Sequence, residues 1–378
     1  MSTEGTTRSG TGAPGSLDDL ELLVDADSHV TESLDDILPY MDDRHRGIRE
    51  MIELSDMPMS DVFSITAPTP IFAYNNQSDD VEVFGGEAGP AGKLEMMDEH
   101  GIDYSVINPT LTAVLNTVNN TRVAVALARA YNGYMLDNFV DADERLKVTV
   151  MVPPQKPSIA AEEIDRHAGE RDVVGVFVPT AGLVPPPGHE MYDPIYEAAE
   201  DHDLPVVFHS NTGAVHRAFP VVHNWTESYA LEHALMHPFT HMWYLASMVF
   251  EGVPVKFPDL DFVFSEAGIG YVPYTLWRLD DHYLEMPHDV PALEKLPSEY
   301  VREQFHFSTQ PLGHTARNGA NIARMIEMIG PELVMYAADM PHPDFDLPGE
   351  LFDRIRGGLD GETTAGVMGN TAAEVFGI

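Results

Sequence analysis

Cysteine is absent from the sequence, which excludes disulfides, thiolate metal sites and a cysteine nucleophile. No apolar run approaches the roughly 20 residues that a membrane-spanning helix needs. Residues 1–20 contain no apolar stretch, so we expect no secretory signal there. They are predicted to form a disordered polar tail ahead of one domain over residues 21–378, and the protein is expected in the cytoplasm.

Basic residues are also scarce. The chain has five lysines among 378 residues, and its 61 acidic residues against 21 Lys plus Arg give a formal net charge of −40. The acidic residues are spread along the chain, which is typical of a surface adapted to high salt. There, dissolved ions screen the repulsion between surface carboxylates. We therefore expect a halophilic source, with an ordinary acidic enzyme as the alternative. Nucleic acid and anionic membranes are poor partners for such a surface.

What the chain does contain is a regular alternation of short apolar runs and helical stretches. Most of the runs are continuous Val, Ile, Leu and Phe, which is typical of parallel strands covered on both faces. Eight βα repeats in this length predict an α/β fold, a (β/α)8 TIM barrel. An open doubly wound sheet is the alternative, but no glycine-rich phosphate loop follows the first strand. The predicted strands are Leu22–Val30, Tyr104–Thr110, Leu146–Pro153, Val173–Pro179, Leu204–His209, Asp261–Glu266, Phe305–Thr309 and Leu333–Asp339.

Two connections are too long to be bare loops. Residues 34–92 follow the first predicted strand, and residues 210–240 follow the fifth. Because both leave the carboxyl ends of their strands, we expect two long insertions at the C-terminal face of the barrel. The first of them is expected to contain short helices.

Polar side chains lie at the carboxyl ends of three predicted strands. Asp27 and His29 are two residues apart in the first strand and therefore share one face. His209 ends the fifth strand and Asp339 ends the eighth. Alone, each has a simpler explanation as a core histidine or a helix cap, but these ends meet at one rim, where barrel active sites lie. Carboxylate and imidazole ligands suit Zn²⁺, and also Mn²⁺ or Fe²⁺.

These motifs resemble the amidohydrolase superfamily, and within it the amidohydrolase-related (amidohydrolase 2) group. That group includes aminocarboxymuconate-semialdehyde decarboxylase and the resorcylate-type decarboxylases. The resemblance runs from about Leu22 to the carboxyl terminus. Its motifs are Asp-Ser-His at 27–29, Leu-Pro-Val ahead of His209, Glu-Gly-Val-Pro-Val-Lys-Phe-Pro-Asp-Leu at 251–260, and Ala-Asp-Met-Pro-His at 338–342.

The resemblance implies a metal-dependent enzyme, either a hydrolase or a carboxy-lyase. Its metal would be one divalent ion, with zinc expected first and manganese or iron as alternatives, held by Asp27, His29, His209 and Asp339. Residues 173–180 contain no lysine that could bridge two ions, which favours a single-metal site. The resemblance also suggests a homodimer.

One position departs from the family pattern. Many of the decarboxylases have a histidine at the end of strand 6, where this chain has Glu266. A carboxylate there can accept and return a proton, or it can hold His209 or a metal-bound water in place. Both roles remain open from the sequence, and His342 is a further candidate acid.

Candidate substrate contacts lie in the loops. His216 and Arg217 follow the fifth strand most closely, and Arg217 is the better partner for an anionic substrate. Thr309, with Gln310, ends the seventh predicted strand and is expected to line the pocket.

A histidine series follows in the same connection. His233, His237 and His241 are four residues apart, so one helix would align them on one face. Pro238 argues against an unbroken helix, and we expect these histidines in a lid or a subunit contact.

Two reactions are compatible with this ligand set. The first expectation is hydrolysis of a C–N or C–O bond in a small organic substrate, aromatic ones included, by a metal-activated water with Asp339 as general base. The alternative is non-oxidative decarboxylation of an aromatic or unsaturated acid, in which Asp339, Glu266 or His342 delivers a proton to carbon. A barrel that binds a small molecule without catalysis is a third hypothesis, which the intact ligand set disfavours.

Overall fold

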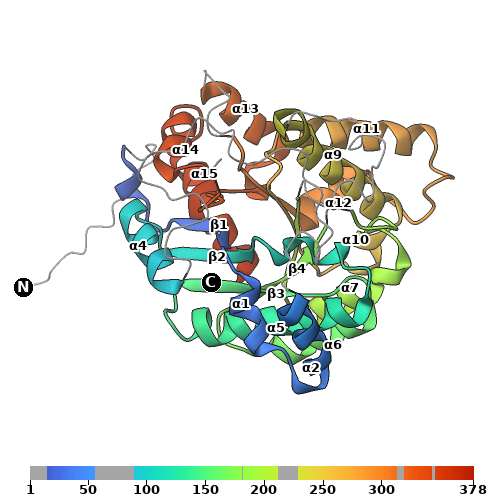
Figure 1. Ribbon diagram of the computed structural model, residues 1–378. Coiled ribbons are helices and arrows are strands. Elements are labelled where there is room, and N and C mark those ends of the chain that lie inside the picture. Colours follow the sequence, from blue (N-terminus) through green and yellow to red (C-terminus); the bar gives the residue numbers. More distant parts are fainter. Residues whose placement is uncertain (1–14, 56–88, 181, 212–228, 313–318, 343–344) are drawn as a thin grey trace, which may run out of the picture.

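The computed structural model in Figure 1 describes residues 15–55, 89–180, 182–211, 229–312, 319–342 and 345–378. Eight parallel strands form one sheet in sequence order, β1 to β8. The predicted (β/α)8 barrel is therefore confirmed. The strands are β1 Val24–Val30, β2 Tyr104–Pro109, β3 Leu146–Met151, β4 Val173–Pro179, β5 Val206–His209, β6 Phe262–Ser265, β7 Phe305–Ser308 and β8 Val334–Met335.

Backbone hydrogen bonds between β1 and the segment after β8 bring the two ends of the sheet together. Ala26 N–H donates to the Tyr336 carbonyl at 3.0 Å, and Asp339 N–H donates to the Asp27 carbonyl at 2.8 Å. The prediction that the eighth strand extends to Asp339 is wrong, because β8 ends at Met335. Asp339 has a φ of 61°, a left-handed conformation that a strand does not accommodate.

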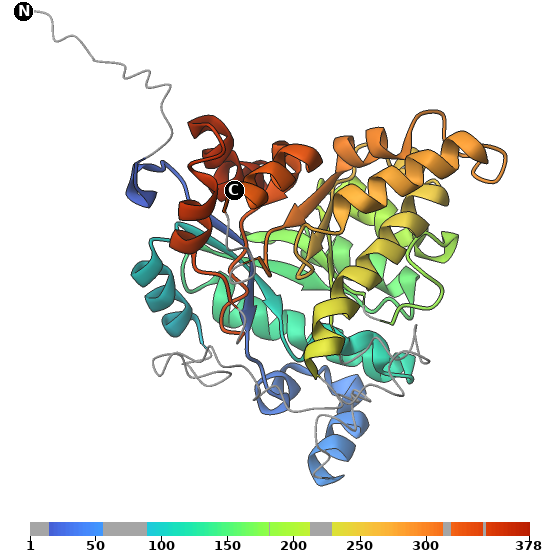
Figure 2. The ribbon, with the colours of Figure 1, turned by 90° about the horizontal axis from the view of Figure 1, so that it is seen from above.

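Helices surround the strands, as Figures 1 and 2 show from two directions. The α-helices are α1 Leu34–Ile37, α2 Arg46–Ser55, α4 Pro90–His100, α5 Thr121–Met135, α6 Pro157–His167, α7 Asp193–Asp201, α9 Tyr229–Phe250, α10 Val253–Lys256, α11 Val272–Glu285, α12 Pro297–Gln304, α13 Gly319–Ile329, α14 Pro348–Ile355, α15 Gly361–Ala365 and α16 Thr371–Phe376. The 3-10 turns are η1 Leu17–Asp19, η2 Leu38–Tyr40, η3 Asp43–His45, η5 Thr112–Thr117, η7 Glu190–Tyr192 and η9 Pro331–Leu333. Two π-helical turns, η6 Leu136–Val140 and η10 Gly366–Asn370, continue α5 and α15.

Local sequence explains where several of these helices begin and end. The Asn120 side chain accepts the backbone N–H groups of Arg122 and Val123 at the start of α5. Proline occupies the first turn of α4, α6, α7, α12 and α14, where its missing N–H costs nothing. Helix α4 ends at Gly101, whose φ of 69° suits the residue that closes a helix.

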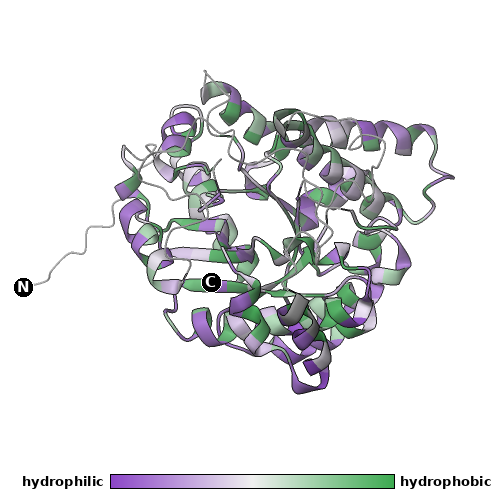
Figure 3. Ribbon diagram, in the orientation of Figure 1, coloured by the Kyte–Doolittle hydropathy of each residue, from purple (hydrophilic) through white to green (hydrophobic). Residues whose placement is uncertain are grey.

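The core lies within the strands and between the strands and the inner faces of the helices. Every residue of β1, β3, β4, β5 and β6 is buried, and Figure 3 shows polar residues mainly on the outer surface. Each fully buried Phe or Leu side chain contributes about 1.5–3 kcal/mol by leaving water. Buried polar residues are most concentrated in β1, where Asp25, Asp27, Ser28 and His29 are all buried.

The first long connection contains α1, η2, η3 and α2, as expected, and its residues 56–88 lie outside the described chain. Of the predicted tail, Leu17–Asp19 forms the turn η1, which Ser16 caps. Residues 1–14 are outside the described chain. Within the described residues, no helix has the length and apolar character needed to cross a bilayer.

Helix α9 corrects the expectation that Pro238 would interrupt this segment, since the proline lies inside one continuous helix. An internal proline removes one backbone hydrogen bond and costs about 3 kcal/mol. Burial of the side chains around it offsets that cost. His237, Thr240, His241, Tyr244 and Leu245 are all buried against the barrel.

Candidate active site

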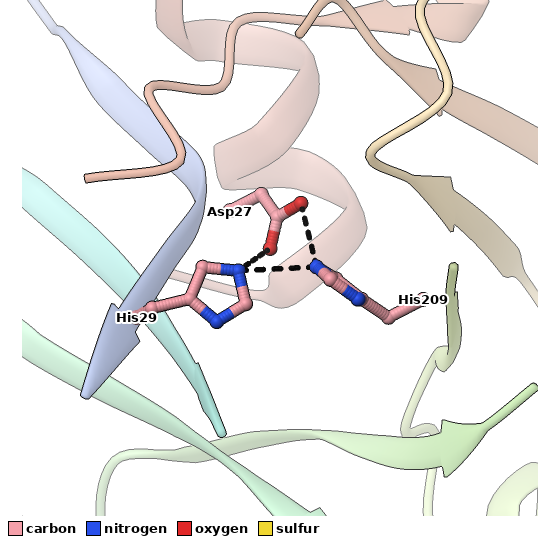
Figure 4. A group of neighbouring side chains, drawn as sticks. All are labelled: Asp27, His29 and His209. Carbon is pink, nitrogen blue, oxygen red and sulfur yellow. Dashed lines mark hydrogen bonds and ion pairs between the residues drawn. The ribbon is translucent and has the colours of Figure 1, made fainter. Parts of the chain in front are cut away.

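Three buried polar side chains meet inside the barrel mouth, as Figure 4 shows for Asp27, His29 and His209. The Nε2 atoms of His29 and His209 are 3.0 Å apart. Asp27 Oδ1 lies 3.5 Å from His29 Nε2, and its Oδ2 lies 3.5 Å from His209 Nε2. Strands β1 and β5 therefore direct four polar atoms toward one point, namely the two imidazole Nε2 atoms and the two carboxylate oxygens of Asp27.

Asp339 joins the same cluster from the segment after β8. Its Oδ1 is 3.1 Å from His29 Nε2, and the side chain is fully buried. The structure thus brings together all four residues that the sequence analysis selected as metal ligands. Asp27, His29 and His209 form one group that could hold an ion, and His29, Asp339 and His342 form another that shares His29.

The protonation of His29 fits a cation at this point. Its Nδ1 lies 3.0 Å from the Pro109 carbonyl, which can only accept, so Nδ1 carries the proton and Nε2 presents a lone pair to the cluster. Burial, assisted by nearby His342, lowers the pKa of His29 to about 4, so the ring is neutral at ordinary pH.

The packing of the ligand atoms also fits a cation. Asp27 Oδ2 is buried without a hydrogen-bond partner among the described residues, and such an atom is costly to bury unless something positive faces it. Two imidazole nitrogens 3.0 Å apart can both reach one ion at the usual metal–nitrogen distance of about 2.0–2.1 Å. The residues present therefore suit one divalent metal ion.

Amide side chains orient the two carboxylates. Asn108 Nδ2 donates to Asp27 Oδ1 at 2.7 Å, and Thr149 Oγ1 donates to Asn108 Oδ1 at 2.7 Å. Gln310 Nε2 donates to Asp339 Oδ2 at 2.8 Å. Sequence analysis missed Asn108, although it is a polar residue near the carboxyl end of β2 and the rule that selected His209 would have found it.

Lys93 of α4 joins two segments of the active-site rim, and sequence analysis missed this residue as well. This buried residue donates through Nζ to Ser28 Oγ at 2.7 Å and to the Met340 carbonyl at 2.9 Å. Charge-assisted hydrogen bonds of this kind contribute about 1.5–3 kcal/mol each. Burial lowers the pKa of Lys93 to about 8. Lys93 therefore ties the β1 segment that carries Asp27 and His29 to the segment that carries Asp339.

Asp25 strengthens the same connection between the two segments. Its Oδ1 accepts the backbone N–H of Ala338 at 2.8 Å and that of Asp27 at 3.2 Å. Burial raises the pKa of Asp25 to about 7 despite these hydrogen bonds.

Glu266, which follows β6, reaches the edge of the cluster. Its Oε2 lies 3.4 Å from His209 Nε2, which is close to the distances between the atoms of the four candidate metal ligands. Its carbonyl accepts a hydrogen bond from His237 Nδ1 at 2.7 Å. His237 is therefore buried beside Glu266 within one chain, which is contrary to the expected subunit contact for this residue. His241 is buried as well, with its Nδ1 3.4 Å from the Tyr271 hydroxyl.

His342 lies directly against Asp339. Its Nδ1 is 2.7 Å from Asp339 Oδ1, and its Nε2 is 3.0 Å from Thr110 Oγ1. Burial would raise the pKa of Asp339, but the neighbouring His342 outweighs it and holds that pKa well below its usual range. The carboxylate is therefore ionised, and His342 is partly exposed on the outer side of the pair.

The predicted substrate contacts have different outcomes. Thr309 is buried, and its hydroxyl accepts the backbone N–H of Ala337 at 3.2 Å, so this side chain supports the rim. Its contact with substrate stays a prediction. His216 and Arg217 lie outside the described residues.

Comparisons with known proteins agree on one family. The sequence model of the amidohydrolase family matches residues 24–378. The gamma-resorcylate decarboxylase of Rhizobium sp. is 25% identical over 274 residues, which cover 69% of this chain and 79% of that protein.

Solved structures of the same fold include 5-carboxyvanillate decarboxylases from two bacteria. That of Sphingomonas paucimobilis has a TM-score of 0.68 at 24% identity, covering 94% of this chain and 99% of the other. That of Novosphingobium aromaticivorans, complexed with manganese and 4-hydroxy-3-methoxy-5-nitrobenzoic acid, has a TM-score of 0.68 at 18% identity, covering 99% and 100%.

Proposed function

The chain belongs to the amidohydrolase family, and from this premise we propose that this enzyme catalyses metal-dependent, non-oxidative decarboxylation of an aromatic or unsaturated carboxylic acid. A hydroxybenzoate is the first candidate substrate. The decarboxylases to which the chain is similar support this alternative over hydrolysis, which was the first expectation from the sequence.

The Asp339–His342 pair is the observation that carries the proposal. Decarboxylation replaces a C–CO₂⁻ bond with a C–H bond, so each turnover consumes one proton at carbon. The contact of 2.7 Å between Asp339 Oδ1 and His342 Nδ1 links a buried carboxylate to a partly exposed imidazole. A proton from the His342 imidazolium would reach the substrate carbon through Asp339.

We propose that Asp27, His29, His209 and Asp339 hold one divalent ion. When bound, this ion supplies the positive charge that orients the substrate carboxylate or a neighbouring hydroxyl. Zinc was the first expectation, but manganese in the Novosphingobium structure supports Mn²⁺ for this chain as well. Two carboxylates and two imidazoles, without a thiolate, suit either metal.

We propose that Glu266 acts at the edge of this centre, on the side of His209. Its carboxylate is 3.4 Å from His209 Nε2, so it can orient the substrate group or water that approaches from that side.

The proposed function predicts carbon dioxide release from small aromatic acids. Metal-loaded protein, incubated at high salt with a panel of hydroxybenzoates, should release CO₂ and the corresponding arene in equal amounts. In D₂O the arene should carry one deuterium at the carbon that lost CO₂, because the proton comes from solvent through the enzyme. Hydrolysis of aromatic amides or esters, with no CO₂ from any acid of the panel, would contradict the proposal.

We also propose that two copies of the chain associate through the outer face of α9. Leu231, Leu235, Phe239 and Trp243 are four residues apart, lie on one face of the helix, and are each 41–54% exposed. The helix has 22 residues with one acidic residue and no Lys or Arg, although the whole chain carries a charge of −40. Between two copies that are equally acidic, charge repulsion is weaker over an uncharged face of this kind.

This interface predicts a dimer that a single acidic substitution disrupts. Trp243→Glu should elute as a monomer in size-exclusion chromatography with light scattering, because it places like charges opposite each other across the contact. Met328→Glu, at an exposed position on α13, adds the same charge elsewhere and should remain dimeric. A monomeric wild-type protein, or a dimeric Trp243→Glu variant, would argue against this surface.

A further inference from the structure

Glu266 has an unusual backbone conformation. Its φ is 61°, in the left-handed region that residues other than glycine rarely adopt. It follows the last residue of β6, so this turn in the chain decides where its carboxylate points. A strained conformation of this kind persists only where the surrounding structure holds it.

Two side chains from neighbouring elements hold the peptide groups of Glu266. Its backbone N–H donates to Ser308 Oγ of β7 at 3.2 Å. Its carbonyl accepts from His237 Nδ1 of α9 at 2.7 Å. Because a carbonyl can only accept, the Nδ1 of His237 must carry a proton.

His237 is suited to this task by its surroundings. It is buried, and burial, assisted by the neighbouring His233, lowers the pKa of its ring well below the ordinary value. The ring is therefore neutral, with its single N–H directed at the Glu266 carbonyl. The same Nδ1 is 3.6 Å from Glu266 Oε1, while Glu266 Oε2 faces His209.

We propose that His237 is a positioning residue, which holds Glu266 in the left-handed conformation so that its carboxylate faces His209 at the edge of the active site. The rate effect of this role rests on the proposed function, whereas the conformational effect does not. His237 thereby connects helix α9, which lies outside the barrel, to the reaction centre inside it.

The test compares variants with and without the N–H donor. His237→Phe keeps a ring of similar size but loses the donor, whereas the amide of His237→Asn places an N–H near the position of Nδ1. We expect kcat to fall about tenfold to a hundredfold in His237→Phe, as for other groups that orient an active-site side chain. His237→Asn should restore most of the rate. If His237→Phe does not fold, His237→Leu replaces it.

Two further measurements separate positioning from a general structural role. In a Glu266→Gln background, His237→Phe should cause little additional loss of kcat, because the carboxylate that it positions is already gone. Crystal structures should show Glu266 leaving the left-handed region in His237→Phe and keeping it in His237→Asn. This second measurement needs no turnover, so it remains informative if the enzyme does not decarboxylate.

Several results would overturn the proposal. One is an unchanged Glu266 conformation in the donor-free variant. Another is a loss of rate in the Glu266→Gln background as large as in the wild type. A third concerns metal content, because His233, His237 and Glu266 lie close enough for one ion. Two metal ions per chain in the wild type, falling to one in His237→Asn, would make His237 a ligand and not a positioning residue.

Discussion

Substitution of Asp339 by asparagine is expected to lower kcat by about 10³-fold, within the range typical for loss of a general acid or base. The amide has nearly the same shape and can still accept the hydrogen bond from Gln310 through its oxygen. It cannot, however, accept a proton from His342 and pass it to carbon. It also removes the negative charge that faces His29 at 3.1 Å, so metal affinity should fall as well.

The measurement is steady-state turnover at saturating metal, with metal content determined on the same samples. Asp353→Asn is the matched control, because it makes the same chemical change on the exposed surface of α14, where Asp353 pairs with Arg356. That variant should keep wild-type turnover. Full activity in Asp339→Asn would remove Asp339 from the proposed mechanism.

Removal of the metal is expected to have the second large effect, on both turnover and stability. Chelation should abolish turnover, and Mn²⁺ or Zn²⁺ should restore it, which also identifies the more effective ion. A ligand at about 1,000 times its Kd stabilises the folded state by about 4 kcal/mol, so the apo protein should unfold at a clearly lower temperature. Without the ion, the buried carboxylates of Asp27 and Asp339 would lose the divalent charge that balances them.

The substitution His209→Ala tests the same metal site by removing one of its proposed ligands. We expect one ion per chain in the wild type by elemental analysis and almost none in the variant, because one of four proposed ligands is lost. His202→Ala is the control, since it removes an imidazole that pairs with Asp165 on the outside of the barrel. Wild-type metal content in His209→Ala would contradict the assignment of the metal to this cluster.

The barrel was predictable because its strands are buried on both faces. Such strands must be continuous apolar runs, so their positions are visible in the sequence, and seven of the eight predicted strands match the structure to within two residues at each end. The eighth was predicted too long. Tyr336, Ala337 and Ala338 are hydrophobic and buried, but Tyr336 N–H donates to the Val367 carbonyl of η10 and not to a neighbouring strand.

The residues that sequence analysis missed share one property. Lys93 is 65 residues from Ser28 in sequence, and Asn108 is 81 residues from Asp27. The carboxyl end of β2 marks Asn108 as a candidate, but no local pattern marks Lys93, because its role arises from packing of α4 against distant segments. His237 was seen as part of a helical series, but only the position of α9 relative to β6 shows that it contacts Glu266.

The sequence by itself determined the fold class and the chemical types of the candidate ligands. Burial of parallel strands requires a periodic apolar pattern, and strand ends in a barrel meet at one rim, so Asp27, His29, His209 and Asp339 could be selected without coordinates. Only the tertiary structure decided how these side chains are oriented. The left-handed backbone at Asp339 and Glu266, and the hydrogen bonds from His237, Gln310 and Asn108, depend on contacts between segments far apart in the chain.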